Sequence, residues 1–229
     1  MKASPFRFET GIKSLDELLG GGFNSGSLNL IYGEATSGKT TLALTIVINH
    51  LNTKRGAKCI YIDSDNKLKM DRVMEIAGEY KSAILTRFNL FIPDTFQKQK
   101  ETLEHLPPLE PFDLLVLDSV TSLYRAETGE EEKTYLLNKE LNHHLGNMAE
   151  LAIKSGACFI LTGQVRSILD FNQVEPVAPR LLSYWNDVII KLKKSPFSSI
   201  RNLTLEKPHR PGNVISVYTT DEGIKEASK

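Results

Sequence analysis

The segment at residues 33–40, G-E-A-T-S-G-K-T, constrains this chain more than any other part of its sequence. It fits the pattern G-x-x-x-x-G-K-[ST], which takes its meaning from a strand before it and a helix after it. Residues 27–32 form a short apolar run typical of a buried strand, and residues 41–50 have the apolar content of a buried helix. This order predicts a phosphate-binding loop rather than a chance glycine-rich turn.

The chemistry of such a loop follows from its backbone. Glycines at 33 and 38 permit torsions that turn successive N–H groups toward an anion, and the following helix adds its positive dipole end. Lys39 is expected to hold the β- and γ-phosphates, and the Thr40 hydroxyl to ligate Mg²⁺. The expected cofactors are therefore ATP and Mg²⁺. The residues expected to contact the nucleotide are Gly33, Glu34, Ala35, Thr36, Ser37, Gly38, Lys39, Thr40 and Thr41.

A second metal-binding residue is predicted at Asp118, which follows the apolar run at residues 114–117. Many buried strands end in aspartate, so this pattern alone is weak. Downstream of a phosphate loop, in a chain of alternating strands and helices, an aspartate at this place typically holds Mg²⁺ through water.

The order of the elements predicts an α/β fold with a mainly parallel, twisted sheet flanked by helices on both faces. Further strands are expected at 58–63, 88–92 and 159–162, with helices between them at 68–80, 95–106 and 134–154. After residue 186, three short β-prone runs follow without helices, which predicts antiparallel strands added to the sheet. We expect one domain, with an arm at 1–9, a parallel α/β core at 10–186 and a β extension at 187–229.

The composition gives little information about partners. Lys and Arg together number 28, as do Asp and Glu, so no overall positive charge indicates nucleic acid, although a local patch is sufficient for binding. Neither a long apolar run nor a signal-peptide pattern is present, so we expect a cytoplasmic protein without a membrane partner. Cys59 and Cys158 lie in strand-like runs and are expected to be buried.

Two segments are expected to lack regular structure. Residues 124–133 are polar and contain three consecutive glutamates, and residues 166–184 contain Pro176 and Pro179. An irregular connection as long as the second one inside a compact domain is usually functional.

Three segments resemble the RecA-type recombinase ATPases, and most closely the RadB branch. They are T-G-I-K-S-L-D-E-L-L-G-G-G at 10–22, D-S-V-T-S-L-Y-R-A-E at 118–127 and G-Q-V at 163–165. The resemblance covers nearly the whole chain from Thr10 onward and implies a RecA-like P-loop NTPase core. It also implies the arrangement of RadB, a paralogue of RadA without the additional N-terminal domain.

The resemblance implies roles for three further residues. Asp65 stands where the family usually has a glutamate that orients the attacking water; its side chain is one methylene shorter, so hydrolysis is expected to be weak. Gln164 matches a glutamine that senses the γ-phosphate and leads into a DNA-binding loop. Arg72 matches an arginine that packs against adenine, although a helix-surface charge is an equally good interpretation. The expected catalytic residues are thus Asp65, Lys39 and Gln164.

The two DNA-binding loops of the family correspond to residues 124–133 and 166–184. The first contains Arg125, and the second contains Arg166 and Arg180, each near acidic residues that weaken a grip on phosphates. Lys207 and Arg210 lie in a basic turn. This turn is expected to serve DNA, to reach the nucleotide of a neighbouring subunit, or to be a solvated hairpin turn.

Three functions are consistent with these residues. The first is a DNA-dependent, weakly hydrolysing ATPase of DNA repair and homologous recombination that binds single-stranded DNA and assists a RadA-type recombinase or other repair protein. The second is a nucleotide-gated protein-binding module, and the third is a KaiC-like signalling ATPase. The KaiC-like family typically has adjacent catalytic glutamates, which Ser64-Asp65 does not match.

A monomer or homodimer is expected rather than a long filament, because Glu9 follows the aromatic residues Phe6 and Phe8 where the recombinase tether has a small residue.

Overall fold

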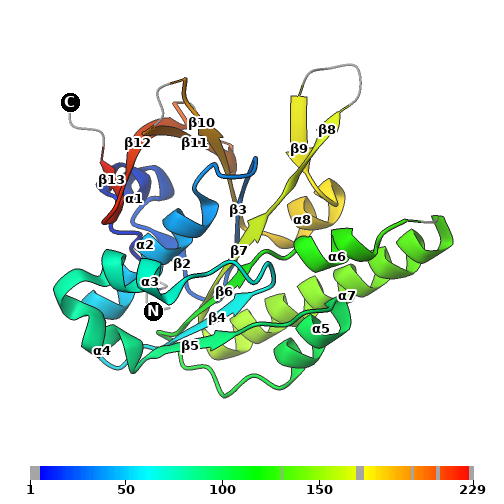
Figure 1. Ribbon diagram of the computed structural model, residues 1–229, viewed down its shortest axis with the longest axis horizontal. Helices are drawn as coiled ribbons and strands as arrows, with labels where there is room; N and C mark the ends of the chain where they lie inside the picture. Colours follow the sequence, from blue (N-terminus) through cyan, green and yellow to red (C-terminus); the bar gives the residue numbers. More distant parts are fainter. Residues whose placement is uncertain (1–5, 130, 169–172, 197–198, 210–211, 227–229) are drawn as a thin grey trace, which may run out of the picture.

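A large mixed sheet forms the centre of the molecule in the computed structural model, which describes residues 6–129, 131–168, 173–196, 199–209 and 212–226 (Figure 1). Its parallel strands are β3 (Leu28–Gly33), β4 (Cys59–Asp63), β5 (Phe88–Phe91), β6 (Leu114–Asp118), β7 (Cys158–Gly163) and β10 (Val188–Lys194). Its antiparallel strands are β11 (Ile200–Lys207), β12 (Val214–Thr220) and β13 (Gly223–Glu226). Within the described residues the order is β13-β12-β11-β10-β3-β7-β6-β4-β5, which confirms the predicted fold class.

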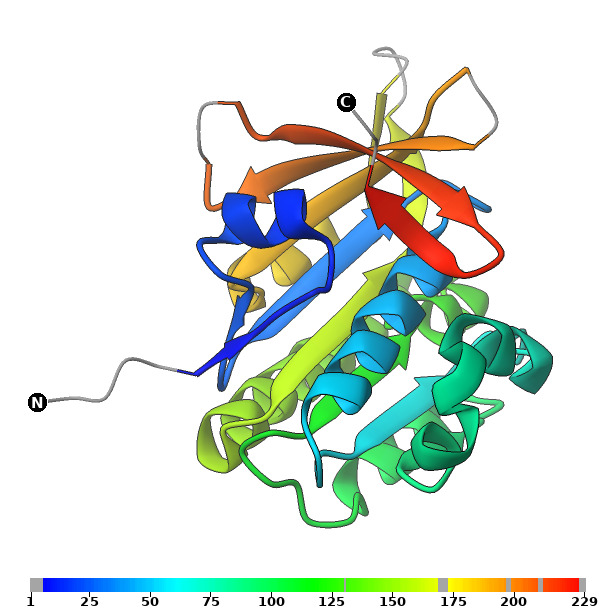
Figure 2. The ribbon, with the colours of Figure 1, turned by 90° about the vertical axis from the view of Figure 1, so that its left-hand side faces the viewer.

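Helices cover both faces of this sheet. They are α1 (Lys13–Leu19), α2 (Lys39–Thr53), α3 (Met70–Ala77), the 3₁₀ turn η1 (Gly78–Tyr80), α4 (Lys81–Leu85), α5 (Phe96–Glu104), α6 (Ser122–Glu127), α7 (Glu131–Ser155) and α8 (Pro179–Trp185). One hydrophobic core holds residues of α1 to α4, and a second holds residues of α5 to α8. Neighbouring residues of β3 face different cores, with Leu30 and Tyr32 in the second and Ile31 in the first. Figure 2 shows α2 across one face, with the C-terminal strands (orange to red) beside it.

The described parts of residues 166–184 are mostly regular, contrary to the prediction, and residues 169–172 lie outside the described part of the chain. The regular parts contain β9 (Gln173–Pro176), which pairs antiparallel with β8 (Val165–Ile168), and α8. Pro176 lies at the end of the ladder, opposite Val165, and Pro179 lies in the first turn of α8, where a missing N–H costs no hydrogen bond. Both prolines thus mark element ends. Figure 1 shows this hairpin projecting from the body of the molecule above α6 and α8.

Other boundaries also differ from the predictions. Residues 124–133 contain the end of α6 and the start of α7, so Arg125 lies on a helix and not on a loop. Within the predicted arm, β1 (Arg7–Phe8) pairs with β2 (Phe23–Asn24), and residues 1–5 lie outside the described part of the chain. Among the described helices, none combines the length and apolar character that spanning a bilayer requires.

Candidate nucleotide and nucleic-acid sites

The phosphate loop connects β3 to α2 with the backbone that its glycines require. Gly38 has a φ of 105° at the start of α2, and Thr36 has a φ of 59°. At Gly33 a β-carbon would lie 2.2 Å from the Leu192 carbonyl oxygen, so β10 passes too close for any side chain. The loop therefore adopts the tight turn before a helix N-terminus that a phosphate-binding segment needs.

Lys39 is positioned at the mouth of this loop. Its ammonium donates to the carbonyl oxygens of Gly33 at 3.0 Å and Glu34 at 2.9 Å. Burial lowers the pKa of Lys39, and the nearby carboxylates of Asp118 and Asp65 partly oppose that shift. The three predicted residues Lys39, Asp65 and Asp118 thus lie within electrostatic reach of one another, at the carboxyl ends of the parallel strands.

Asp118 is the centre of a buried hydrogen-bond network. One of its oxygens, Oδ2, accepts hydrogen bonds from Thr40 Oγ1 at 2.6 Å and from Tyr61 Oη at 2.7 Å, and the other accepts one from the Thr162 hydroxyl. Three hydroxyls around one carboxylate fix its orientation beside the loop. Nearby, the buried hydroxyls of Ser37 and Ser119 have no hydrogen-bond partner within the described structure.

Asp65 lies just beyond β4. Its backbone N–H donates to Asp63 Oδ1 at 3.2 Å, and Asp63 Oδ2 accepts from the Leu68 N–H at 2.7 Å, so Asp63 fixes the turn that carries Asp65. The carboxylate of Asp65 pairs with the exposed Lys67 at 3.4 Å. Asp65 is partly buried and Lys67 is exposed, and an ion pair with one partner in solvent contributes little stability, so Asp65 is not locked in this position.

Gln164 lies between β7 and β8, at the base of the hairpin. Its N–H donates to Thr121 Oγ1 at 3.0 Å, and its carbonyl oxygen accepts from the Val177 N–H at 2.9 Å. Arg125 Nη1 lies 3.5 Å from Gln164 Oε1 and 3.4 Å from the Val165 carbonyl oxygen. Gln164 therefore contacts the strand ends of the core, the hairpin and an arginine of α6.

Arg72 contacts the C-terminal strands. Its guanidinium donates to the carbonyl oxygens of Asp221 at 2.6 Å and Thr220 at 2.9 Å, and to Glu75 at 3.0 Å. These contacts connect α3 to the turn between β12 and β13. The ion pair with Glu75 matches the interpretation of Arg72 as a surface charge paired with a carboxylate. The packing of Arg72 against adenine stays a prediction.

Three of the five predicted DNA-contacting residues line one cleft of about 830 Å³. Arg125 comes from α6, Arg166 from β8 and Arg180 from α8, and no acidic residue is among the described residues that line the cleft. Arg166 also pairs with Glu175 of β9 at 2.8 Å. Elements that are distant in sequence thus bring three cations together.

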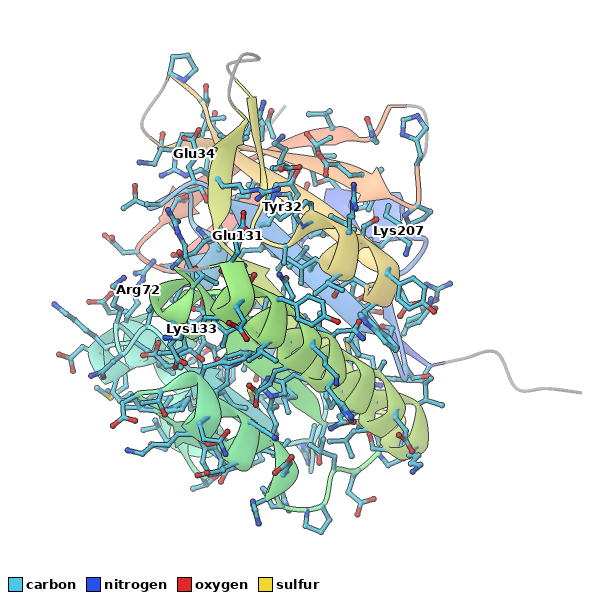
Figure 3. The ribbon with its side chains drawn as sticks, turned by 90° about the vertical axis from the view of Figure 1, so that its right-hand side faces the viewer. Tyr32, Glu34, Arg72, Glu131, Lys133 and Lys207 are labelled. Atoms are coloured by element: carbon cyan, nitrogen blue, oxygen red, sulfur yellow. The ribbon has the colours of Figure 1, made fainter. Side chains whose placement is uncertain are left out.

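The remaining two predicted residues do not join this cleft. Lys207 donates through its ammonium to the Ser183 carbonyl oxygen of α8 at 2.9 Å, and Figure 3 shows it beside that helix. Arg210 lies outside the described residues.

Several residues of the site have no clear signal in the sequence. Tyr61 and Thr162 are polar groups in otherwise apolar strands, a signal that was present but ambiguous. Arg201 donates from Nε to the Ser37 carbonyl oxygen at 2.9 Å across 164 positions, and Lys194 donates to the Thr36 hydroxyl. No local pattern indicates these two contacts.

Comparisons with known proteins agree with this geometry. A family model described as Rad51 matches residues 2–227. A DNA repair and recombination protein RadB of Methanosphaera stadtmanae is 32% identical over 219 residues, which cover 92% of each chain. A RadB of Thermococcus gammatolerans is 34% identical, with 96% of this chain and 98% of the relative covered.

A solved structure described as "Crystal structure of the RadB recombinase" superposes with a TM-score of 0.81 at 33% identity, and 96% of this chain and 100% of that chain are covered. The fold, the loop and these similarities together lead to one assignment. The chain belongs to the Rad51/RecA family and, within it, to the RadB branch.

Proposed function

We propose that this chain is an ATP-binding, weakly hydrolysing protein of DNA repair and recombination that contacts single-stranded DNA. The observation that carries the nucleotide part is the 2.6 Å hydrogen bond between Thr40 and Asp118, beside a loop whose lysine is already directed to its mouth. The repair and recombination part is supported by the names of its RadB relatives.

The residues at the loop fit Mg²⁺ and ATP. Mg²⁺ typically takes one or two protein oxygens and completes its shell with water and substrate phosphates. Thr40 and Asp118 offer a hydroxyl and a carboxylate, and no cluster of three His, Cys, Asp or Glu side chains in the described chain suggests a protein-only cage. Bound there, Mg²⁺ supplies charge neutralisation on the β- and γ-phosphates.

The chain's own residues divide the remaining work. Residues 33–41 cradle the phosphates with backbone N–H groups, and Lys39 neutralises their charge. Asp65 orients the attacking water, and its short side chain and its pairing with Lys67 support slow hydrolysis. Gln164 responds to the terminal phosphate and transmits its presence to the β8–β9 hairpin through its contacts with Val177 and Arg125.

Single-stranded DNA is proposed to enter the cleft that contains Arg125, Arg166 and Arg180. Each phosphate that an arginine neutralises adds affinity and steepens the dependence on salt. Arg125 connects this cleft to the nucleotide site, because its guanidinium contacts Gln164. DNA contact and nucleotide state are therefore expected to influence each other.

A monomer or homodimer that assists a recombinase fits this chain better than a long filament. Phe6 packs inside its own molecule. Its ring centroid lies 4.9 Å from the centroid of Phe8 and 4.9 Å from that of Phe112, and the Lys54 ammonium lies 4.6 Å from the same ring. An aromatic residue engaged in this way is not available as a tether for a second copy.

A salt titration of single-stranded DNA binding, with and without Mg²⁺-ATP, tests the DNA part of the proposal. We expect tighter binding with ATP and a clear salt slope, and a weaker affinity and shallower slope in Arg180→Gln. Arg55→Gln is the matched control, because Arg55 is exposed beyond the carboxyl end of α2, far along the helix from the loop. If the affinity for single-stranded DNA changes neither with ATP nor with the Arg180→Gln substitution, the result would instead favour the function of a nucleotide-gated protein-binding module.

A further inference from the structure

Two cations of the C-terminal strands touch the phosphate loop. Lys194, the last residue of β10, and Arg201 of β11 are directly opposite each other in the antiparallel ladder. The Lys194 ammonium donates to the Thr36 hydroxyl, and Arg201 Nε donates to the carbonyl oxygen of Ser37, the next residue of the loop. None of the roles derived above uses either cation.

The sheet register explains why this pair lies at the loop. β10 runs parallel to β3, with Leu192 beside Gly33, so the chain of β10 continues past the point where the loop begins. The missing β-carbon of Gly33 lets the two strands approach closely. Residue 194 therefore lies beside the loop at Thr36, whose backbone is left-handed.

The two cations differ in how firmly they are held. Arg201 is 9% exposed, and its guanidinium also donates to the Ile200 carbonyl oxygen at 2.9 Å, so it braces the loop backbone. Lys194 is exposed, and its ammonium, at the end of a side chain of four methylenes, contacts the neutral hydroxyl of Thr36. A phosphate oxygen forms a stronger, charge-assisted hydrogen bond with an ammonium than a hydroxyl does.

We propose that Lys194 is a phosphate-binding residue that the C-terminal strands supply to the nucleotide site of the same chain. When ATP occupies the loop, the ammonium leaves the Thr36 hydroxyl and binds the terminal phosphate, on a different side from Lys39, which enters from α2. ADP lacks this phosphate, so Lys194 favours ATP over ADP. The inference rests on the nucleotide site proposed above.

The test compares Lys194→Gln with Lys193→Gln by calorimetric titration with Mg²⁺-ATP and with Mg²⁺-ADP. Glutamine keeps a donor for Thr36 but removes the charge, so a residue that only braces the loop would tolerate the change. Lys193 is the adjacent, exposed lysine, and its side chain points to the opposite face of the strand.

We expect Lys194→Gln to weaken ATP binding roughly 10- to 100-fold, as the loss of a hydrogen bond between charged groups predicts, and to change ADP binding by less than about threefold. Lys193→Gln should match the wild type for both nucleotides, and Lys194→Arg should restore most of the preference for ATP. Equal losses for ATP and ADP, or a Lys194→Gln variant like the control, would overturn the proposal. A wild-type chain that binds neither nucleotide would overturn the proposed function itself, a result separate from these.

Discussion

The Thr40 hydroxyl donates a 2.6 Å hydrogen bond to Asp118 across 78 positions of the chain. The contact follows from topology, because β3 and β6 are both parallel neighbours of β7 and end at the same edge of the sheet. The same carboxylate accepts hydrogen bonds from Tyr61 and Thr162, which come from the two strands that flank β6. Asp118 is thus held on three sides before any metal arrives.

Replacement of Asp118 by Asn is expected to weaken Mg²⁺ binding, so that ATP binding requires a higher Mg²⁺ concentration. The amide oxygen of the asparagine still accepts a hydrogen bond, but the amide N–H groups face a hydroxyl that is itself a donor. The lost hydrogen bond lowers the free energy of unfolding by about 1–3 kcal/mol. Titration of ATP at increasing Mg²⁺ concentrations would show a requirement at least about tenfold higher than in the wild type. Asp71→Asn, at an exposed position of α3, is the control. An unchanged Mg²⁺ requirement in Asp118→Asn would remove this residue from the metal site.

Lys39→Ala is expected to weaken ATP binding by about two orders of magnitude, because a charge-assisted contact with two phosphates is lost. The nucleotide-free protein should keep its stability, since burial already penalises the charged form of Lys39 and lowers its pKa. Thermal unfolding with and without Mg²⁺-ATP measures both effects. Lys67→Ala, an exposed neighbour of the site, should keep the ATP-induced stabilisation. An equal stabilisation in Lys39→Ala would contradict the assignment of the loop.

Asp65→Glu is expected to increase the rate of ATP hydrolysis several-fold, because the added methylene extends the carboxylate toward the attacking water. The pairing with Lys67 lies at the surface and does not prevent the longer side chain from reorienting. Steady-state phosphate release at saturating ATP measures the rate, with Asp71→Glu as a matched control at an exposed site. If the rate of Asp65→Glu stays the same or falls, another group places the water.

The sequence was sufficient for the features that depend on local order. The phosphate loop, the strand ending in Asp118 and three β runs after residue 186 were predicted from short patterns, and the structure has the loop and a strand at each of the other places. The first of these runs, β10, is parallel to β3 and not antiparallel as predicted, and the antiparallel strand β13 was not predicted. Contacts between distant strands were not predictable in this way. The contacts of Lys194 and Arg201 with the loop depend on the register of β10 beside β3.

Two prolines account for the main error in the predicted fold. Pro176 and Pro179 were interpreted as signs of irregular structure, but a proline is equally compatible with a strand end and with a first helical turn. The sequence alone does not decide between these roles, because the decision rests on whether the flanking residues find partners. Val165 and Ile168 find strand partners in Pro176 and Gln173 of β9, on the other side of the hairpin.

The buried His144 is expected to make the stability of the fold depend on pH. It lies on α7, is 3% exposed, and has its ring centroid 4.7 Å from that of Phe96 on α5. Neither ring nitrogen has a hydrogen-bond partner among the described residues, and burial lowers the pKa of His144 to about 4. The Lys100 charge adds to this shift, while Glu104 opposes it and a Glu140 oxygen lies 3.9 Å from the ring.

Because the folded state disfavours the protonated ring, the unfolded chain binds more protons between its ordinary pKa of about 6.5 and about 4. The free energy of unfolding should therefore be highest above pH 6.5 and fall as the pH decreases, with His144 accounting for about 3 kcal/mol by pH 4. Urea unfolding at several pH values measures this slope, to which His50 also contributes because burial lowers its pKa. His144→Leu should flatten the slope, whereas His143→Gln, at an exposed position, should leave it intact. Equal slopes in His144→Leu and the wild type would show that the buried ring does not control the acid stability of this fold.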